Sequence, residues 1–176
     1  MRVLTARYES GFEGQLTGGE RWFPCAFGRA GVTTEKREGD HATPLGTYAL
    51  RSAYWRPDRV ARPVTDLPTI PIRAGLGWCD APDHPLYNRP VRLPFAASHE
   101  VMTRKDGAYD LCVTLSHNAD PPVPGAGSAV FLHLTKPPDG PLTPTEGCVA
   151  LREAALRNLL RGCSIGSRLV IERADA

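Results

Sequence analysis

Glycine and proline are spread along the whole chain, and this distribution is the strongest constraint that the sequence places on its fold. The 176 residues contain 17 of each, with no repeat period and no single linker that gathers most of them. Both residues interrupt helices and occupy turns. We therefore expect one mainly β domain over residues 1–176, built from many short segments.

Short apolar or β-branched runs between turn residues mark the expected strands. They cover residues 3–7, 22–27, 46–51, 110–115, 128–134 and 168–172. One helix is expected near the end of the chain. Its apolar side is formed by Leu151, Ala154, Ala155, Leu159 and Leu160, and Gly162 follows as its stop. Residues 33–43 are expected to be a loop, as is the stretch 57–94, and long irregular loops of that kind tend to be functional.

Charge and hydropathy exclude several classes of partner. The chain has 21 Lys and Arg against 19 Asp and Glu, and they are scattered. A nucleic-acid protein would show a basic stripe, so no nucleic acid is expected. The apolar runs are too short to span a membrane. Residues 1–7 show no apolar export segment, which leaves open a cytoplasmic protein or an exported one whose signal was removed.

Cys148 is the first candidate for chemistry. It follows a Pro-rich loop and directly precedes the expected helix. A helix N-terminus stabilises a thiolate and lowers the thiol pKa, and Gly147 would let nearby amides point at an oxyanion. The alternative is a buried, inert cysteine, which is the expectation for Cys25, Cys112 and Cys163. Five cysteines, Cys79 included, leave at least one thiol unpaired.

His133 is the second candidate, near the end of the strand expected over residues 128–134. Alternation places Phe131 and His133 on one face of that strand, and Leu132 and Leu134 on the other. The histidine could act as the general base for the thiol, or it could be a core residue bound to a carbonyl.

Two other chemistries have weaker support. A zinc site could combine Cys148 with His84, His99, Glu100 or His117, but no HxxxH or CxxC pair accompanies these residues. A serine hydrolase would need a GxSxG turn, and the sequence has none. We therefore expect no metal and no cofactor.

His133, a loop and then Thr145-Glu146-Gly147-Cys148-Val149 together resemble the signature of the YkuD-type L,D-transpeptidases. The stretch Thr43-Pro44-Leu45-Gly46-Thr47-Tyr48 is similar to the Thr-Pro-x-Gly-Thr-aromatic element of that family's substrate cleft. The resemblance runs from about Phe23 to Glu172. It is nearest to a compact branch that carries Gly-Trp-Cys-Asp, Tyr-Asn-Arg and Ser-His-Glu, here residues 77–80, 87–89 and 98–100. Two positions depart from the family pattern. Glu146 stands where a His commonly precedes the Gly-Cys pair, and Leu134 stands where a Gly often follows the catalytic His.

The resemblance implies a β-sandwich or barrel with one helix after Cys148 and few other short helices. It also implies an enzyme of peptidoglycan biosynthesis, with roles in cell-wall biogenesis and cell shape, in the periplasm or bacterial cell envelope. Cys148 would form a thioester with a stem peptide, and His133 would take the thiol proton while the Leu134 carbonyl orients its ring. Amides around Gly147 and Cys148 would bind the oxyanion. An amine of a second stem would complete a 3–3 or 1–3 cross-link.

Alternatives remain within and outside the enzyme class. Water as acceptor would make the protein an L,D-carboxypeptidase, and a domain without turnover would only bind peptidoglycan. The substrate would contact eight further residues: Thr43, Trp78, Asp80, Tyr87, Arg89, Ser98, His99 and Glu146. For the members in the irregular stretch, the competing interpretation is that they brace a long loop. Carbapenem-type β-lactams are expected to acylate Cys148 by the same resemblance.

Overall fold

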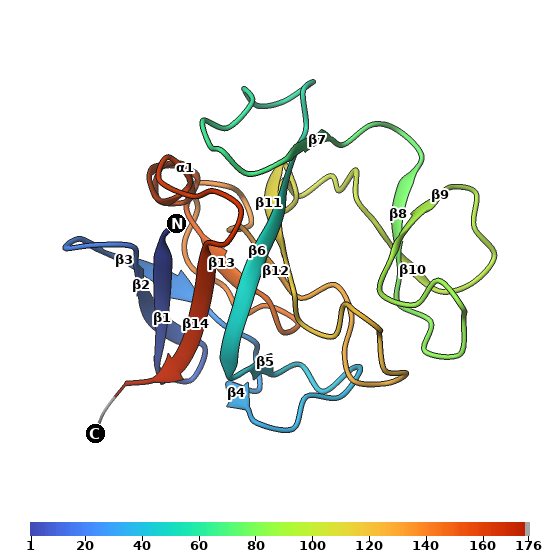
Figure 1. Cartoon of the computed structure of the whole chain (residues 1–176), viewed down its shortest axis with the longest axis horizontal. Coiled ribbons are helices and arrows are strands. Elements are labelled where there is room, and N and C mark those ends of the chain that lie inside the picture. Colours follow the sequence, from blue (N-terminus) through green and yellow to red (C-terminus); the bar gives the residue numbers. More distant parts are fainter. Residues whose placement is uncertain (175–176) are drawn as a thin grey trace.

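The computed structural model describes residues 1–174 and shows a mainly β protein with one helix (Figure 1). The helix, α1 (Glu153–Leu160), follows Cys148, as the fold-class prediction required. No further short helix occurs within those residues. The strands are β1 (Val3–Ser10), β2 (Glu13–Thr17), β3 (Trp22–Ala26), β4 (Val32–Thr33), β5 (Thr43–Pro44), β6 (Gly46–Trp55), β7 (Thr69–Pro71), β8 (Leu76–Cys79), β9 (Pro90–Arg92), β10 (His99–Val101), β11 (Leu111–Leu115), β12 (Phe131–Leu134), β13 (Val149–Leu151) and β14 (Arg168–Arg173).

The main sheet closes into a barrel. Its strand order is β11-β12-β13-β3-β2-β1-β14-β6-β7, and β11 also pairs with β6. The ring therefore runs from β6 back to β11, and β7 is attached to β6 outside the ring. Two parallel pairings lie within it, β1 with β14 and β12 with β13. Closure removes the free edges that an open sheet of short strands would expose.

The barrel core takes alternate residues of its strands. Leu111, Val113 and Leu115 of β11 and Leu132 and Leu134 of β12 all belong to this cluster. The buried face of α1, made by Ala155, Leu156, Leu159 and Leu160, packs into the same cluster. The helix thus fills the barrel with its apolar side.

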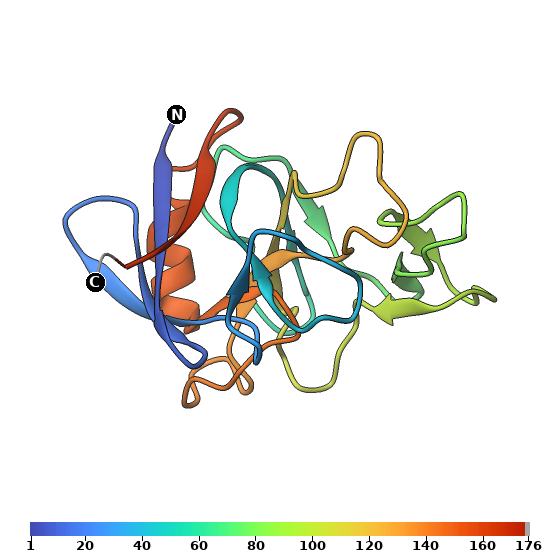
Figure 2. The ribbon, with the colours of Figure 1, turned by 90° about the horizontal axis from the view of Figure 1, so that it is seen from below.

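A second apolar cluster lies on the outer face of β11 and β12. It contains Cys112 and Phe131 from those strands, together with Trp78, Tyr109 and Cys148. The small sheet β10-β8-β9 lies beyond it, at the opposite end of the molecule from α1 and β1 (Figures 1 and 2). Phe131 and His133 therefore face away from the barrel core, which confirms the predicted alternation.

Four sequence-based expectations for the secondary structure were wrong. Residues 57–94 are not wholly irregular, because β7, β8 and β9 lie within them, and β2 was missed between two predicted strands. The strand expected over 128–134 begins only at Phe131, since Ala129 has a left-handed backbone (φ 50°) that no strand accommodates. Finally, β13 comes between Cys148 and the helix, so α1 begins later than predicted.

Candidate active site

The parallel pairing of β12 and β13 brings the two candidate residues to one cavity. Leu132 lies opposite Val149 and His133 opposite Ala150, so Cys148, the residue before β13, lies beside Phe131. Cys148 and His133 both line a cavity of about 270 Å³. The cavity opens between the loop after β4, the segment that leads into β12 and the segment that ends at Cys148.

The Cys148 thiol is buried. Backbone groups of Phe131, the first residue of β12, and of Ala129, two residues earlier, hold it in place. Its Sγ accepts a hydrogen bond from the Phe131 amide at 3.3 Å and donates one to the Ala129 carbonyl at 3.2 Å. Burial raises the pKa of Cys148 to about 12, although the Phe131 amide and the charge of Lys36 oppose that shift. The expected activation by a helix N-terminus was wrong, because β13 separates Cys148 from α1. The resting group is a neutral thiol.

His133 is equally enclosed. Its Nδ1 lies 2.7 Å from the carbonyl oxygen of Leu134, the partner that the family resemblance implied. Its ring stands edge-on to Tyr109, with 5.5 Å between the ring centroids. Burial lowers the pKa of His133 to about 4, while the Leu134 carbonyl acts in the opposite direction. The ring is therefore neutral at pH 7, with Nδ1 as donor and Nε2 free to accept a proton.

The backbone at Cys148 is fixed by two threonine hydroxyls. Thr43 and Thr145 donate to the Cys148 carbonyl at 3.2 and 2.7 Å, and the Thr43 hydroxyl also accepts from the Gly28 amide. The Gly147 amide donates to the Thr145 hydroxyl at 3.1 Å, so this amide is already occupied in the resting structure. Gly147 itself has φ 133°, a conformation that glycine adopts readily and other residues do not.

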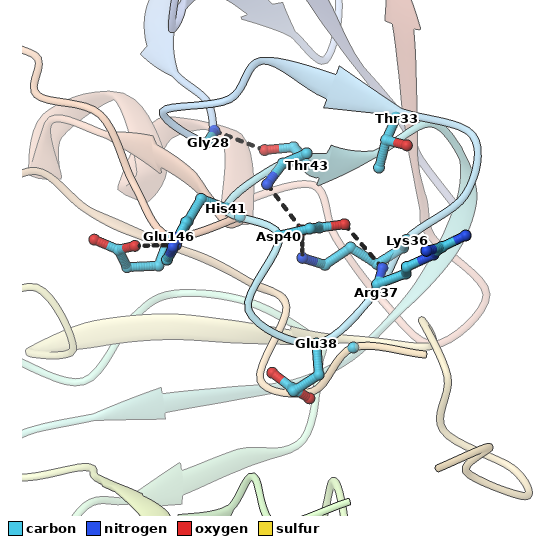
Figure 3. A network of polar contacts seen from close by, with 12 residues as sticks. Gly28, Thr33, Lys36, Arg37, Glu38, Asp40, His41, Thr43 and Glu146 are labelled. Carbon is cyan, nitrogen blue, oxygen red and sulfur yellow. Dashed lines mark hydrogen bonds and ion pairs between the residues drawn. The ribbon is translucent and has the colours of Figure 1, made fainter. Parts of the chain in front are cut away.

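One side of the cavity is formed by the loop between β4 and β5. Lys36 is 7% exposed and forms an ion pair with Asp40, which also accepts from the amides of Arg37 and Ala42 (Figure 3). Burial acts to raise the pKa of Asp40, but the bonds from Lys36 and the amides outweigh it, so the pKa is lowered. His41 meets the Glu146 carboxylate at 2.6 Å beside this pair.

The other side carries charges of both signs. Asp80, Glu100, Arg104 and Lys136 all line the cavity. Arg104 is bound to Glu100 and Asp106, and burial raises the pKa of Glu100 although Arg104 opposes it. Within residues 1–174, Lys136 has no ion-pair partner and the buried Oδ1 of Asp80 has no hydrogen-bond partner. Lys136 is therefore the cation of this wall without an ion-pair partner in the described residues, and Asp80 carries a buried oxygen that no described group satisfies.

The sequence was also compared with known proteins. A family model for the L,D-transpeptidase catalytic domain matches residues 12–171, which is most of the chain. The chain belongs to this family. A comparison with curated protein sequences gives no match. Among solved structures, the chain is similar to the crystal structure of Mycobacterium tuberculosis L,D-transpeptidase 1, with 13% identity and a TM-score of 0.38. The similarity covers 97% of this chain and 62% of that one, so this L,D-transpeptidase domain spans less than two thirds of that protein.

The L,D-transpeptidase domain brings only some of the predicted substrate residues to its cavity. Asp80 and Glu146 line the cavity, and Thr43 lies behind Cys148. Tyr87 is buried and donates to Glu38 of the cavity wall. Four others lie elsewhere: Trp78 and Arg89 line a second cavity of about 230 Å³, and His99, the first residue of β10, binds the Ala97 carbonyl. Ser98 is exposed next to that strand.

Several cavity residues of the L,D-transpeptidase domain escaped sequence analysis. They are Glu38, Arg104, Tyr109, Ala129 and Lys136. Each stands in a loop whose path depends on contacts distant in sequence, and no local pattern marked it. Within residues 1–174 no three His, Cys, Asp or Glu residues come together as metal ligands, and no helix is long and apolar enough to cross a membrane. All five cysteines are free and buried.

Proposed function

We propose that Cys148 transfers an acyl group between peptidoglycan stem peptides through a thioester, with His133 as its general base. The observation that carries this proposal is the shared cavity, which holds a thiol and a neutral imidazole whose Nδ1 is already satisfied. A neutral pair of this kind needs no preformed thiolate, because the imidazole can accept the proton as sulfur attacks.

The proposed reaction has two balanced halves. Cys148 Sγ bonds to the carbonyl carbon of a stem amide, and the thiol proton passes through His133 Nε2 to the amine that leaves as the C–N bond breaks. An amine of a second stem then attacks the thioester carbon, its proton passes to His133, and the C–S bond breaks with return of that proton to sulfur. The Cys148 amide is the proposed oxyanion donor, since the Gly147 amide is bound to Thr145.

The charges around the cavity support a zwitterionic peptide as substrate. Lys136 is unpaired among the described residues and suits a stem carboxylate, and the buried Oδ1 of Asp80 suits a substrate N–H or ammonium group. Glu146 stands at the rim with His41 and Arg29, where it would limit the approach of a second anionic strand. A role in cell-wall biogenesis and cell shape, in the periplasm or cell envelope, follows as part of the proposal.

Mass spectrometry of muropeptides tests this function. Purified stem peptides are incubated with the wild-type protein, with Cys148→Ala and with Cys25→Ala, which removes a thiol of the barrel core. We expect cross-linked dimers from the wild type and Cys25→Ala, and none from a folded Cys148→Ala protein. The position of the cross-link distinguishes 3–3 from 1–3 products. Shortened stems without dimers would identify a carboxypeptidase, and neither product would identify a binding domain.

A further inference from the structure

The carbonyl that holds the Cys148 thiol belongs to a residue in an unusual conformation. Ala129 accepts the thiol hydrogen bond at 3.2 Å and has φ 50°. The left-handed region is unfavourable for a residue with a Cβ, so it persists only where surrounding contacts hold it. Some other group must therefore hold the Ala129 backbone in place.

The Asn88 side chain makes that contact. Its Oδ1 accepts from the Ala129 amide at 3.0 Å and from the Trp78 indole at 2.9 Å. Its Nδ2 donates to the backbone carbonyls of His117, at 3.2 Å, and Asn118, at 2.7 Å. A side-chain amide has two donors and a carbonyl with two acceptor sites, so all four are used. Asn88 is 6% exposed, so these bonds form in a largely buried environment.

We propose that Asn88 is a positioning residue for Cys148, which acts by holding the Ala129 carbonyl against the thiol. Asn88 does not line the Cys148 cavity; it lines the second cavity, together with Trp78 and Phe131. The inference rests on the proposed function, in which Cys148 is the nucleophile. It gives the middle residue of Tyr87-Asn88-Arg89 a role that neither of its neighbours shares.

Loss of this contact should affect the thiol in two opposite ways. A hydrogen bond from S–H to a carbonyl favours the neutral thiol, so without it Cys148 should deprotonate at lower pH. The same loss frees Sγ to leave the orientation from which it attacks a bound amide, so acyl transfer should become slower.

The test compares two asparagines with similar backbones. Asn88 has φ 55° and Asn118 has φ 45°, so glycine is tolerated at both and each substitution removes only a side chain. Asn118 binds Val123 and Gly127 within its own loop, and its side chain does not reach Ala129. Asn118→Gly is therefore the matched control. Two quantities are measured: the pH dependence of Cys148 alkylation by iodoacetamide, located by peptide mapping, and kcat for cross-linking.

For Asn88→Gly we expect the alkylation midpoint to fall by about one pH unit and kcat to fall by about tenfold or more. Asn118→Gly should change neither by a comparable amount. Unchanged values in folded Asn88→Gly would overturn the proposal, as would equal effects in the control. If Asn88→Gly shifts the alkylation midpoint but the wild type forms no cross-links, the role of Asn88 stands and the proposed function is rejected.

A measurement on the wild type covers the case in which Asn88→Gly does not fold. Alkylation of Cys148 removes the S–H donor, so it should shift the NMR signals of the Ala129 amide and the Asn88 side-chain amide. The signal of Asn158, exposed on α1, should stay in place. If the Asn88 signal also stayed in place, the two residues would not be coupled and the proposal would fail.

Discussion

The His133 ring is anchored by its own neighbour, with Nδ1 2.7 Å from the Leu134 carbonyl oxygen. A carbonyl can only accept, so Nδ1 carries the proton of the neutral ring and Nε2 is the nitrogen that can accept a proton. The bond also explains why a Leu is tolerated where the family often has Gly, since the backbone supplies the contact.

The first prediction concerns the acid limit of acyl transfer. The proposed reaction uses a neutral His133 as its base, and burial lowers the pKa of this residue to about 4. Because the ring stays neutral above that value, kcat/KM should be retained at pH 5.5 and fall only as pH approaches about 4. The profile is measured from pH 3.5 to 8. An acid limb near the ordinary histidine value of about 6.5 would contradict the buried environment of the base.

The second prediction concerns covalent inhibitors. A carbapenem that enters the cavity should acylate Cys148, because this is the cysteine that lines the cavity while the other four are fully buried. Intact-protein mass should rise by one drug equivalent, and peptide mapping should place the adduct on Cys148. Labelling spread over Cys25, Cys79, Cys112 and Cys163 would show that the cavity confers no selectivity.

The third prediction concerns the backbone at Gly147. An added Cβ would lie 2.9 Å from the Ala42 carbonyl oxygen and 3.2 Å from Lys36 Nζ, at a φ of 133°. Gly147→Ala should therefore lower the free energy of unfolding by about 1–3 kcal/mol and slow acyl transfer. Gly11→Ala is the control, since its φ is also positive but its Cβ meets nothing within 4 Å. Urea titrations compare the two variants. Equal destabilisation would mean that neither the contact nor the φ of 133° at Gly147 adds to the cost of a left-handed alanine.

The fourth prediction separates Lys136, which sequence analysis missed, from Arg89, which it named as a substrate contact. Lys136 lines the Cys148 cavity, whereas Arg89 lines the second cavity and binds Asp120 at 2.9 Å. Lys136→Gln should raise KM for stem peptides by about tenfold, and Arg89→Gln should change kcat/KM by less than about threefold. Steady-state kinetics of the two variants on one donor peptide measure these effects. The reverse order would return Arg89 to the substrate-binding role expected from the sequence.

The sequence predicted most of the barrel because its strands carry strong local patterns. The alternation over Phe131 to Leu134 identified the correct inner and outer faces. The Gly147-Cys148 pair and the strand histidine identified the two residues that meet in the cavity. Residues 149–151 carry the same apolar signal as the helix that follows them, so the sequence pattern predicts a helix that begins there, where the structure has β13. Periodicity does not separate a three-residue strand from a helix start.

The surroundings of the thiol could not be predicted in the same way. Asn88 reaches Ala129 across 41 positions of sequence, and Tyr87 reaches Glu38 across 49. Such contacts follow from how the β8–β10 sheet packs against β12, which no local pattern encodes. Sequence analysis singled out the three short elements near Trp78, Asn88 and His99 as the substrate wall, but the structure places these three side chains outside the lining of the Cys148 cavity.

The parallel register of β12 and β13 has a consequence for how such proteins diversify. Backbone pairing fixes His133 relative to Cys148, so the segment 135–147 that joins them in sequence does not set their separation. Lengthening a surface segment has only a small entropic cost. Insertions between Pro138 and Pro144 could therefore accumulate during evolution, and each would reshape the surface beside the cavity while Cys148 and His133 keep their relative positions.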